Sequence, residues 1–183
     1  MSFLCIEILN SDRVDYATSK TRRDLLEDEI WMRALLERWQ LEAPLPVPAT
    51  VLGKMKELRE QMYLILTGMP EKVDGINRIL GSNAIRVRLG FRQNKYILDR
   101  AYDAVGWDFV LWSIAKSFAD MLCTQDLSRI KICDNPECGW AFYDGSKNKS
   151  RRWCDDKTCG NLMKVRRYRE RQRADGKCKK ATE

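Results

Sequence analysis

Four cysteines near the C-terminus form two pairs with the same internal spacing. Cys133 and Cys138 enclose four residues, Cys154 and Cys159 also enclose four, and fifteen residues separate the pairs. Each pair can supply two ligands from one tight turn, and zinc prefers four ligands in a tetrahedron. With sulfur in every position, no place remains for a catalytic water. The spacing therefore predicts one structural Zn²⁺ ion.

The redox setting supports metal binding by these cysteines. The chain has seven cysteines, and an odd number argues against complete disulfide pairing. The N-terminal sequence MSFLCIEILN lacks the basic region and cleavage site of a signal peptide, so we expect a cytoplasmic protein with reduced thiols. A disulfide pair and an iron–sulfur cluster remain the alternatives for the quartet.

The composition argues against an enzyme. The chain contains no histidine, which removes the commonest general base and every Ser–His or Cys–His nucleophile pair. Asp99, Asp103 and Asp108 are interpreted as surface, turn or capping carboxylates, and a paired-carboxylate site stays open as the alternative. We therefore predict a protein without catalytic activity.

The positive charge of the chain is concentrated in its C-terminal third. The formal net charge is +7, and the segment from Arg129 onward holds 16 Lys and Arg residues against 8 Asp and Glu residues. The preceding residues are close to neutral. A basic surface of this kind is typical of proteins that bind nucleic acid.

A basic helix is predicted directly after the last cysteine. Residues 161–173 contain neither proline nor glycine, and Leu162, Val165 and Tyr168 recur at a spacing that would let them pack inward. Cations that repel one another at helical spacing require a counter-anion such as phosphate. Six cations form two neighbouring outward rows: Lys164, Arg167 and Arg171, and Arg166, Arg169 and Arg173.

The loop before Cys154 adds four more cations, Lys147, Lys149, Arg151 and Arg152, among hydroxyl and amide donors. One zinc site would hold this loop and the basic helix rigidly together, so we predict that all ten cations contact DNA. A merely solvated charged face is the alternative. The aromatic residues between the two pairs are expected to pack on the zinc knuckle, with base stacking as the alternative: Trp140, Phe142, Tyr143 and Trp153.

The elements that precede the cysteines form a mixed helical and β pattern. Residues 21–24 resemble a capping box that opens a helix ending before Pro44, and Thr50 is expected to cap a second helix ended by Gly68 and Pro70. A short third helix is expected to close at Gly81. Alternating residues then predict a hairpin over 85–91 and 95–102, followed by a central apolar helix over 105–123.

The predicted fold class is therefore α+β in two parts. Residues 1–128 form a mostly helical domain with a β-hairpin. Residues 129–175 form a small treble-clef-like finger that ends in the basic helix, and residues 176–183 form a flexible tail.

Three motifs resemble the CGNR-type zinc-finger family of bacterial stress-induced transcription regulators, in which an N-terminal ABATE domain precedes the finger. They are C-x4-C-G-W-x-F at residues 133–142, Ser146-x-Asn148-x-Ser150-Arg-Arg-Trp-Cys154, and Cys159-Gly-Asn followed by x-x-Lys-x-Arg-Arg-Tyr-Arg. The family signature ends in arginine, where this chain has Leu162. The resemblance implies a DNA-binding transcriptional regulator whose four cysteines bind zinc.

The expected partner is therefore DNA. A zinc-stapled RNA-binding module and a protein-interaction module are the alternatives. The N-terminal domain is then expected to sense a small-molecule effector or to form a homodimer. No membrane partner is expected, because charges interrupt the longest apolar stretches well short of about 18 residues.

Overall fold

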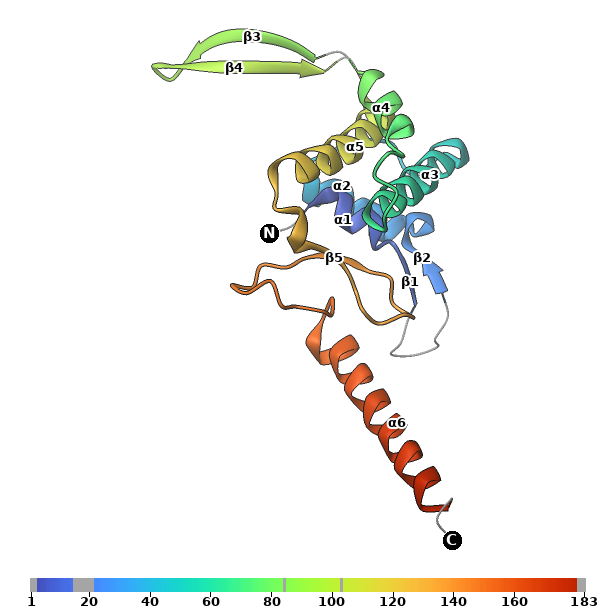
Figure 1. Ribbon diagram of the computed structural model, residues 1–183. Coiled ribbons are helices and arrows are strands. Elements are labelled where there is room, and N and C mark those ends of the chain that lie inside the picture. The colour runs from blue at the N-terminus through green and yellow to red at the C-terminus, as the bar shows by residue number, and fades with distance from the viewer. Residues whose placement is uncertain (1–2, 15–21, 84, 103, 181–183) are drawn as a thin grey trace. The chain divides into compact units, whose positions relative to one another are not determined.

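The computed structural model describes residues 3–14, 22–83, 85–102 and 104–180 (Figure 1). The chain divides into two compact units, Met1–Leu127 and Ser128–Glu183. Each unit is described separately below.

The N-terminal unit combines five helices with two short antiparallel sheets among the described residues. The helices are α1 (Leu4–Leu9), α2 (Glu29–Trp39), α3 (Ala49–Leu66), α4 (Asp74–Gly81) and α5 (Gly106–Thr124). The strands are β1 (Asp12–Val14) paired with β2 (Arg22–Asp24), and β3 (Ile85–Arg92) paired with β4 (Lys95–Tyr102).

Helix α5 lies at the centre of this unit and packs against α1, α3 and α4 (Figure 1). It is apolar on most faces, and Val110, Ile114, Phe118 and Met121 are completely buried. Burying each such side chain stabilises the fold by about 1.5–3 kcal/mol. The predicted central helix is thus confirmed.

The hairpin β3–β4 turns at Gln93 and Asn94, whose φ angles are 51° and 61°. This left-handed pair matches the right-handed twist of the two strands, and asparagine tolerates it better than most residues. At its base, the Tyr102 ring lies 5.1 Å from that of Phe109 on α5. The predicted hairpin is confirmed.

The predicted start of the first long helix is wrong. Arg22–Asp24 is a strand, a 3-10 turn follows over Leu25–Glu27, and α2 begins only at Glu29. Long-range pairing is the reason: both carboxylate oxygens of Asp24 accept hydrogen bonds from Arg59, at 2.7 and 2.8 Å. Asp28 caps α2 instead, because its Oδ1 accepts from the N–H groups of Ile30 and Trp31.

The predicted cap of the next helix is also wrong. Helix α3 begins at Ala49 with Pro48 as its N-cap residue, so Thr50 lies inside the first turn. The Pro48 carbonyl accepts from the N–H groups of Val51 and Leu52, both at 2.9 Å. The helix ends near Gly68, as predicted, where a φ of 114° favours glycine.

The C-terminal unit is a small hairpin followed by a long helix. Strands β5 (Ile130–Ile132) and β6 (Ala141–Tyr143) are antiparallel, a π-turn covers Asp156–Gly160, and α6 extends over Asn161–Lys180. The predicted α+β fold with a terminal basic helix is confirmed. Helix α6 includes Gly176, where the sequence predicted a flexible tail, because an isolated glycine keeps the backbone hydrogen bonds of a helix.

Candidate metal centre and nucleic-acid interface

The first cysteine pair lies on the knuckle between β5 and β6. The N–H of Cys133 donates to the Trp140 carbonyl at 2.8 Å, and the N–H of Cys138 donates to the Asn135 carbonyl at 2.9 Å. Asn135 also accepts from the N–H of Glu137 through its side chain, which closes an Asx turn. Gly139 continues with a φ of 67°. These contacts turn both thiols toward the same side of the knuckle.

The second cysteine pair, Cys154 and Cys159, lies directly before the basic helix. Asp155 caps the π-turn, because its Oδ1 accepts from the N–H and the hydroxyl of Thr158, at 2.7 and 2.9 Å. Cys159 lies in that turn directly before α6. Gly160 lets the indole of Trp153 pack closely, since a Cβ at this position would lie only 3.2 Å from it. The turn therefore couples the direction of α6 to the position of Cys159.

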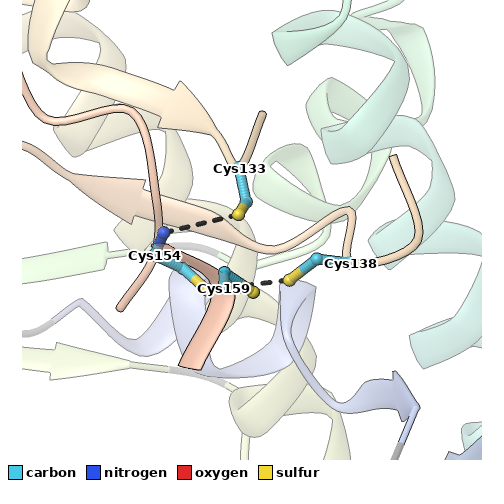
Figure 2. A group of neighbouring side chains, drawn as sticks. All are labelled: Cys133, Cys138, Cys154 and Cys159. Atoms are coloured by element: carbon cyan, nitrogen blue, oxygen red, sulfur yellow. Dashed lines mark hydrogen bonds between the residues drawn. The ribbon is translucent and has the colours of Figure 1, made fainter. Parts of the chain in front are cut away.

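The four cysteine side chains converge on one point (Figure 2). Their Sγ atoms all lie within 4.8 Å of one another. The Sγ of Cys154 is 3.6 Å from that of Cys138 and 3.7 Å from that of Cys159. Sulfurs bound at about 2.3 Å to a tetrahedral zinc ion stand about 3.8 Å apart. The quartet therefore fits one zinc ion, as predicted.

The surrounding donors favour charged sulfur. The N–H of Cys154 donates to the Sγ of Cys133, and the Asn135 amide donates to the Sγ of Cys159, both at 3.4 Å. Hydrogen bonds of this kind orient metal ligands and stabilise thiolates. The Asn135 side chain therefore both closes the turn between Cys133 and Cys138 and donates to the sulfur of Cys159.

The thiol pKa values explain why a cation is needed. The hydrogen bond from Cys154 lowers the pKa of the Cys138 thiol to about 6, and the same contact raises the pKa of Cys154 far above its usual value. Burial raises the pKa of Cys159 to about 11. A site without metal can therefore hold one thiolate easily but not four. A divalent metal allows all four thiols to ionise, because its positive charge stabilises each coordinating thiolate.

Aromatic side chains cover the metal centre. Phe142 is buried with Cys133 and Cys159, and Trp140 and Trp153 pack half-buried against the same cluster. The predicted packing on the zinc knuckle is confirmed for these three rings. Tyr143 is half-buried and lies outside the cluster.

A buried carboxylate, which sequence reasoning missed, organises the basic loop. The Asp144 side chain has no solvent exposure and accepts from the Lys131 ammonium at 2.7 Å, the Ser146 hydroxyl at 2.6 Å and the Arg151 N–H at 3.0 Å. Lys131 and Ser146 hold the pKa of this carboxyl well below its usual range. The only signal in the sequence was a lone aspartate before Gly145, which more simply indicates an exposed turn.

The four predicted loop cations have different surroundings. Lys147 is exposed, and Lys149 is exposed but donates to the Ser128 hydroxyl at 3.0 Å. Arg151 is half-buried, and its guanidinium donates to the carbonyls of Trp153 and Cys154. Arg152 is exposed and pairs with Asp134 at 2.6 Å. Arg151 thus braces the loop, while the other three face solvent.

The six predicted helix cations are all exposed. Arg166 pairs with Glu170 at 3.2 Å, and Arg171 donates to the Arg167 carbonyl at 3.4 Å. Among the ten predicted cations, the charged groups of four form no hydrogen bond, ion pair or ring contact in the described finger: Lys147, Lys164, Arg169 and Arg173.

One aromatic ring connects the loop to the helix. The guanidinium carbon of Arg152 lies 5.2 Å from the Trp153 ring centroid, and that of Arg167 lies 5.7 Å from the same ring. Both distances are within the range of cation–π contacts. The structure therefore brings loop and helix cations together at Trp153, immediately beside the cysteine cluster.

The predicted inward stripe of α6 is wrong. Leu162, Val165 and Tyr168 are 46%, 47% and 59% exposed. Helical spacing places them on one face, but within the described finger no strand or helix covers that face. Leu162, at the signature position, therefore stands in the first turn of α6 without a packing role in this unit.

The carboxylates considered for catalysis do not form a described site. Asp108 is exposed in the first turn of α5. The side chain of Asp99 and the whole of Asp103 lie outside the described residues. In the part of the chain that the structure describes, no helix is long and apolar enough to cross a membrane.

Comparison with protein-family models gives two matches that together span nearly the whole chain. Residues 3–125 match the ABATE model, described as "Putative stress-induced transcription regulator", and residues 129–172 match the CGNR zinc finger. Neither description is that of an enzyme. No curated protein matches the chain.

Proposed function

This chain belongs to the ABATE family of stress-induced transcription regulators, and from its CGNR zinc finger we propose that it is a DNA-binding transcriptional regulator. In this proposal Cys133, Cys138, Cys154 and Cys159 bind one structural zinc ion. The ion fixes the basic loop against the basic helix, and both elements contact the DNA backbone.

The meeting of Arg152 and Arg167 over Trp153 carries the proposal. Arg152 belongs to the loop and Arg167 to α6, and their common ring lies next to Cys154 in the chain. Zinc bound at Cys154 and Cys159 would therefore set the spacing between the two groups of cations. When the spacing is fixed, several cations can contact successive phosphates, and the protein loses less conformational entropy at each contact.

The rows of cations on α6 favour a partner that carries regularly spaced negative charges. Lys164, Arg167 and Arg171 stand three and four residues apart, so each repels the next. Few acidic side chains lie among them, and Glu170 already pairs with Arg166. A phosphate backbone relieves this repulsion and releases counterions on binding. If α6 enters the major groove, Arg166 or Arg167 can also donate to guanine edges.

The burial of the aromatic rings favours duplex DNA over single-stranded RNA. Base stacking needs exposed rings, whereas Phe142 is buried and Trp140 and Trp153 pack against the cysteines. Effector sensing and homodimerisation then fall to the N-terminal unit. The reduced thiols of the quartet suit the cytoplasm.

A competition experiment tests the choice of partner. The zinc-loaded full-length chain is mixed at low salt with a labelled DNA duplex, and unlabelled DNA duplex or structured RNA of equal length is added. We expect the DNA duplex to displace the label at lower concentration than the RNA. Failure to bind DNA at low salt contradicts the proposal, and stronger competition by RNA favours an RNA-binding function instead.

Replacing Arg167 by alanine should remove about one phosphate contact. Each contact contributes about −0.9 to the slope of log Kobs against log salt concentration, so we expect a slope less negative by roughly one. Fluorescence anisotropy of labelled duplex at several salt concentrations measures the slope. Arg33→Ala is the matched control, because Arg33 is an exposed arginine of the N-terminal unit. An unchanged slope in Arg167→Ala removes Arg167 from the interface.

A further inference from the structure

A cavity of about 560 Å³ lies in the N-terminal unit between α3, α4 and the start of α5. Its lining follows helical spacing on both long walls: Lys54, Glu57, Leu58 and Gln61 on α3, and Gly75, Arg78, Ile79 and Ser82 from α4 onward. Ala104, together with Asp108 and Leu111 of α5, completes it. Small-molecule sites commonly enclose about 300–1,000 Å³. The cavity is therefore large enough for a metabolite.

One residue that lines the cavity, Gln61, carries a polar atom that lacks a partner. Among the described residues, the Oε1 atom of Gln61 is buried and accepts no hydrogen bond. The amide reaches this position because residue 75 is glycine, where a Cβ would lie 2.1 Å from Oε1. Buried amide oxygens are almost always hydrogen-bonded, so the Gln61 amide is an exception that is held against Gly75 at the wall of the cavity.

The remaining lining is apolar inside and charged at the rim. Leu58 is buried, and Ile79 and Leu111 lie beside it along the cavity. Four exposed groups surround the opening, and none forms an ion pair or hydrogen bond with another described residue: the cations Lys54 and Arg78, and the carboxylates Glu57 and Asp108.

The equal numbers of the two charges select the class of ligand. A purely anionic ligand would meet Glu57 and Asp108, and a purely cationic one would meet Lys54 and Arg78. A ligand with one ammonium and one carboxylate on an apolar body satisfies both signs. We propose that this cavity binds a small zwitterion of the amino-acid or dipeptide class.

Binding at this cavity is independent of the DNA interface, and only its role as the effector site rests on the proposed function. The rim cations hold the ligand carboxylate, and the rim carboxylates hold its ammonium. The cavity is larger than a single amino acid needs, so a dipeptide with apolar side chains fills more of it.

Calorimetric titration of the zinc-loaded full-length chain tests the proposal. The probes are L-leucine, L-phenylalanine and leucyl-leucine, each compared with its N-acetylated and its C-amidated form. We expect at least one unblocked probe to bind, and each blocked form of it to bind at least tenfold more weakly, because it loses a charge-assisted contact. Tighter binding of leucyl-leucine identifies the dipeptide as the source of the zwitterion.

Two variants locate the binding site. Arg78→Ala should weaken binding of the best probe at least tenfold, and Gly75→Ala should weaken it by displacing the Gln61 amide. Lys72→Ala is the control, since Lys72 is exposed and does not line the cavity. Circular dichroism checks that each variant is folded.

Three results overturn the proposal: no heat from any probe at millimolar concentration, equal binding of blocked and unblocked probes, or full affinity in folded Arg78→Ala. DNA binding by the same preparation is measured separately. A protein that binds DNA but no zwitterion contradicts only this inference, and one that binds a zwitterion but no DNA contradicts only the proposed function.

Discussion

A Cys154→Ser variant is expected to lose its stoichiometric zinc, to unfold the C-terminal unit and to lose DNA binding at about 0.15 M salt. The N-terminal unit should keep its helical structure, because its core around α5 uses none of the four clustered cysteines. The expected effect is large because Cys154 is one of the four converging cysteines, and its Sγ lies 3.6 and 3.7 Å from two neighbouring sulfurs.

The magnitudes explain why this unit depends on metal. A unit of this size rarely gains more than about 3–5 kcal/mol from its hydrophobic core. Structural zinc contributes about 10–16 kcal/mol in comparable finger peptides near neutral pH. Removing one ligand therefore removes more free energy than the remaining contacts can replace.

Zinc content by atomic absorption, together with anisotropy of a labelled duplex, measures both losses. Cys123→Ser is the matched control, because Cys123 is an exposed cysteine outside the cluster. It should retain one zinc ion per chain and full DNA affinity. A Cys154→Ser protein that still carries one zinc ion would contradict the assigned ligands.

The second large effect is expected for Asp144→Asn. The variant should keep its zinc, melt several degrees lower in the C-terminal unit, and bind DNA about an order of magnitude more weakly. An amide has one acceptor oxygen where the carboxylate has two, and its NH₂ group faces either the Lys131 ammonium and the Arg151 N–H or the N–H and hydroxyl of Ser146. The loop that carries Lys147 and Lys149 then loses its anchor.

The pH dependence of this effect has a definite sign. Because the folded state lowers the pKa of Asp144, its carboxylate stabilises the fold above the unfolded carboxyl pKa of about 3.9, and this contribution is lost only as pH falls through the lower folded value. The stability deficit of Asp144→Asn should therefore be constant from about pH 5 to pH 8. Thermal melts over this range, with zinc content measured in parallel, test it. A deficit that changes within this range would contradict the assigned role.

Local patterns were sufficient for much of the fold and for the metal centre. The repeated spacing of Cys133, Cys138, Cys154 and Cys159 predicted one cluster, because each pair lies within a single turn. Alternating residues predicted the hairpin over 85–91 and 95–102, and the structure closes it with a two-residue turn of positive φ at Gln93 and Asn94. The apolar run of α5 predicted a central helix, because a helix that is apolar on most faces must be covered on most faces.

The errors arose where a distant residue decides the local structure. Asp24 resembled part of a capping box, but Arg59 on α3 binds its carboxylate and leaves Asp28 to cap α2. Leu162 and Tyr168 follow helical spacing, yet spacing does not specify whether another element covers that face. Asp144 resembled an ordinary turn residue, because the sequence does not show that Lys131, 13 residues earlier, pairs with it in the folded finger.

The structure also separates the ten cations that the sequence grouped together. Arg151 donates to backbone carbonyls inside the finger, so its substitution should affect folding as well as DNA binding. Arg166 is partly neutralised by Glu170. The four cations whose charged groups form no hydrogen bond, ion pair or ring contact in the described finger are the strongest candidates for phosphate contacts: Lys147, Lys164, Arg169 and Arg173.

Zinc titration into reduced, metal-free protein tests the central claim most directly. Anisotropy of a labelled DNA duplex is followed at about 0.15 M salt as zinc is added. The account predicts weak binding without zinc and an increase that saturates at one zinc ion per chain. Equal DNA binding by the metal-free protein in the presence of chelator, or no increase at saturating zinc, would contradict it.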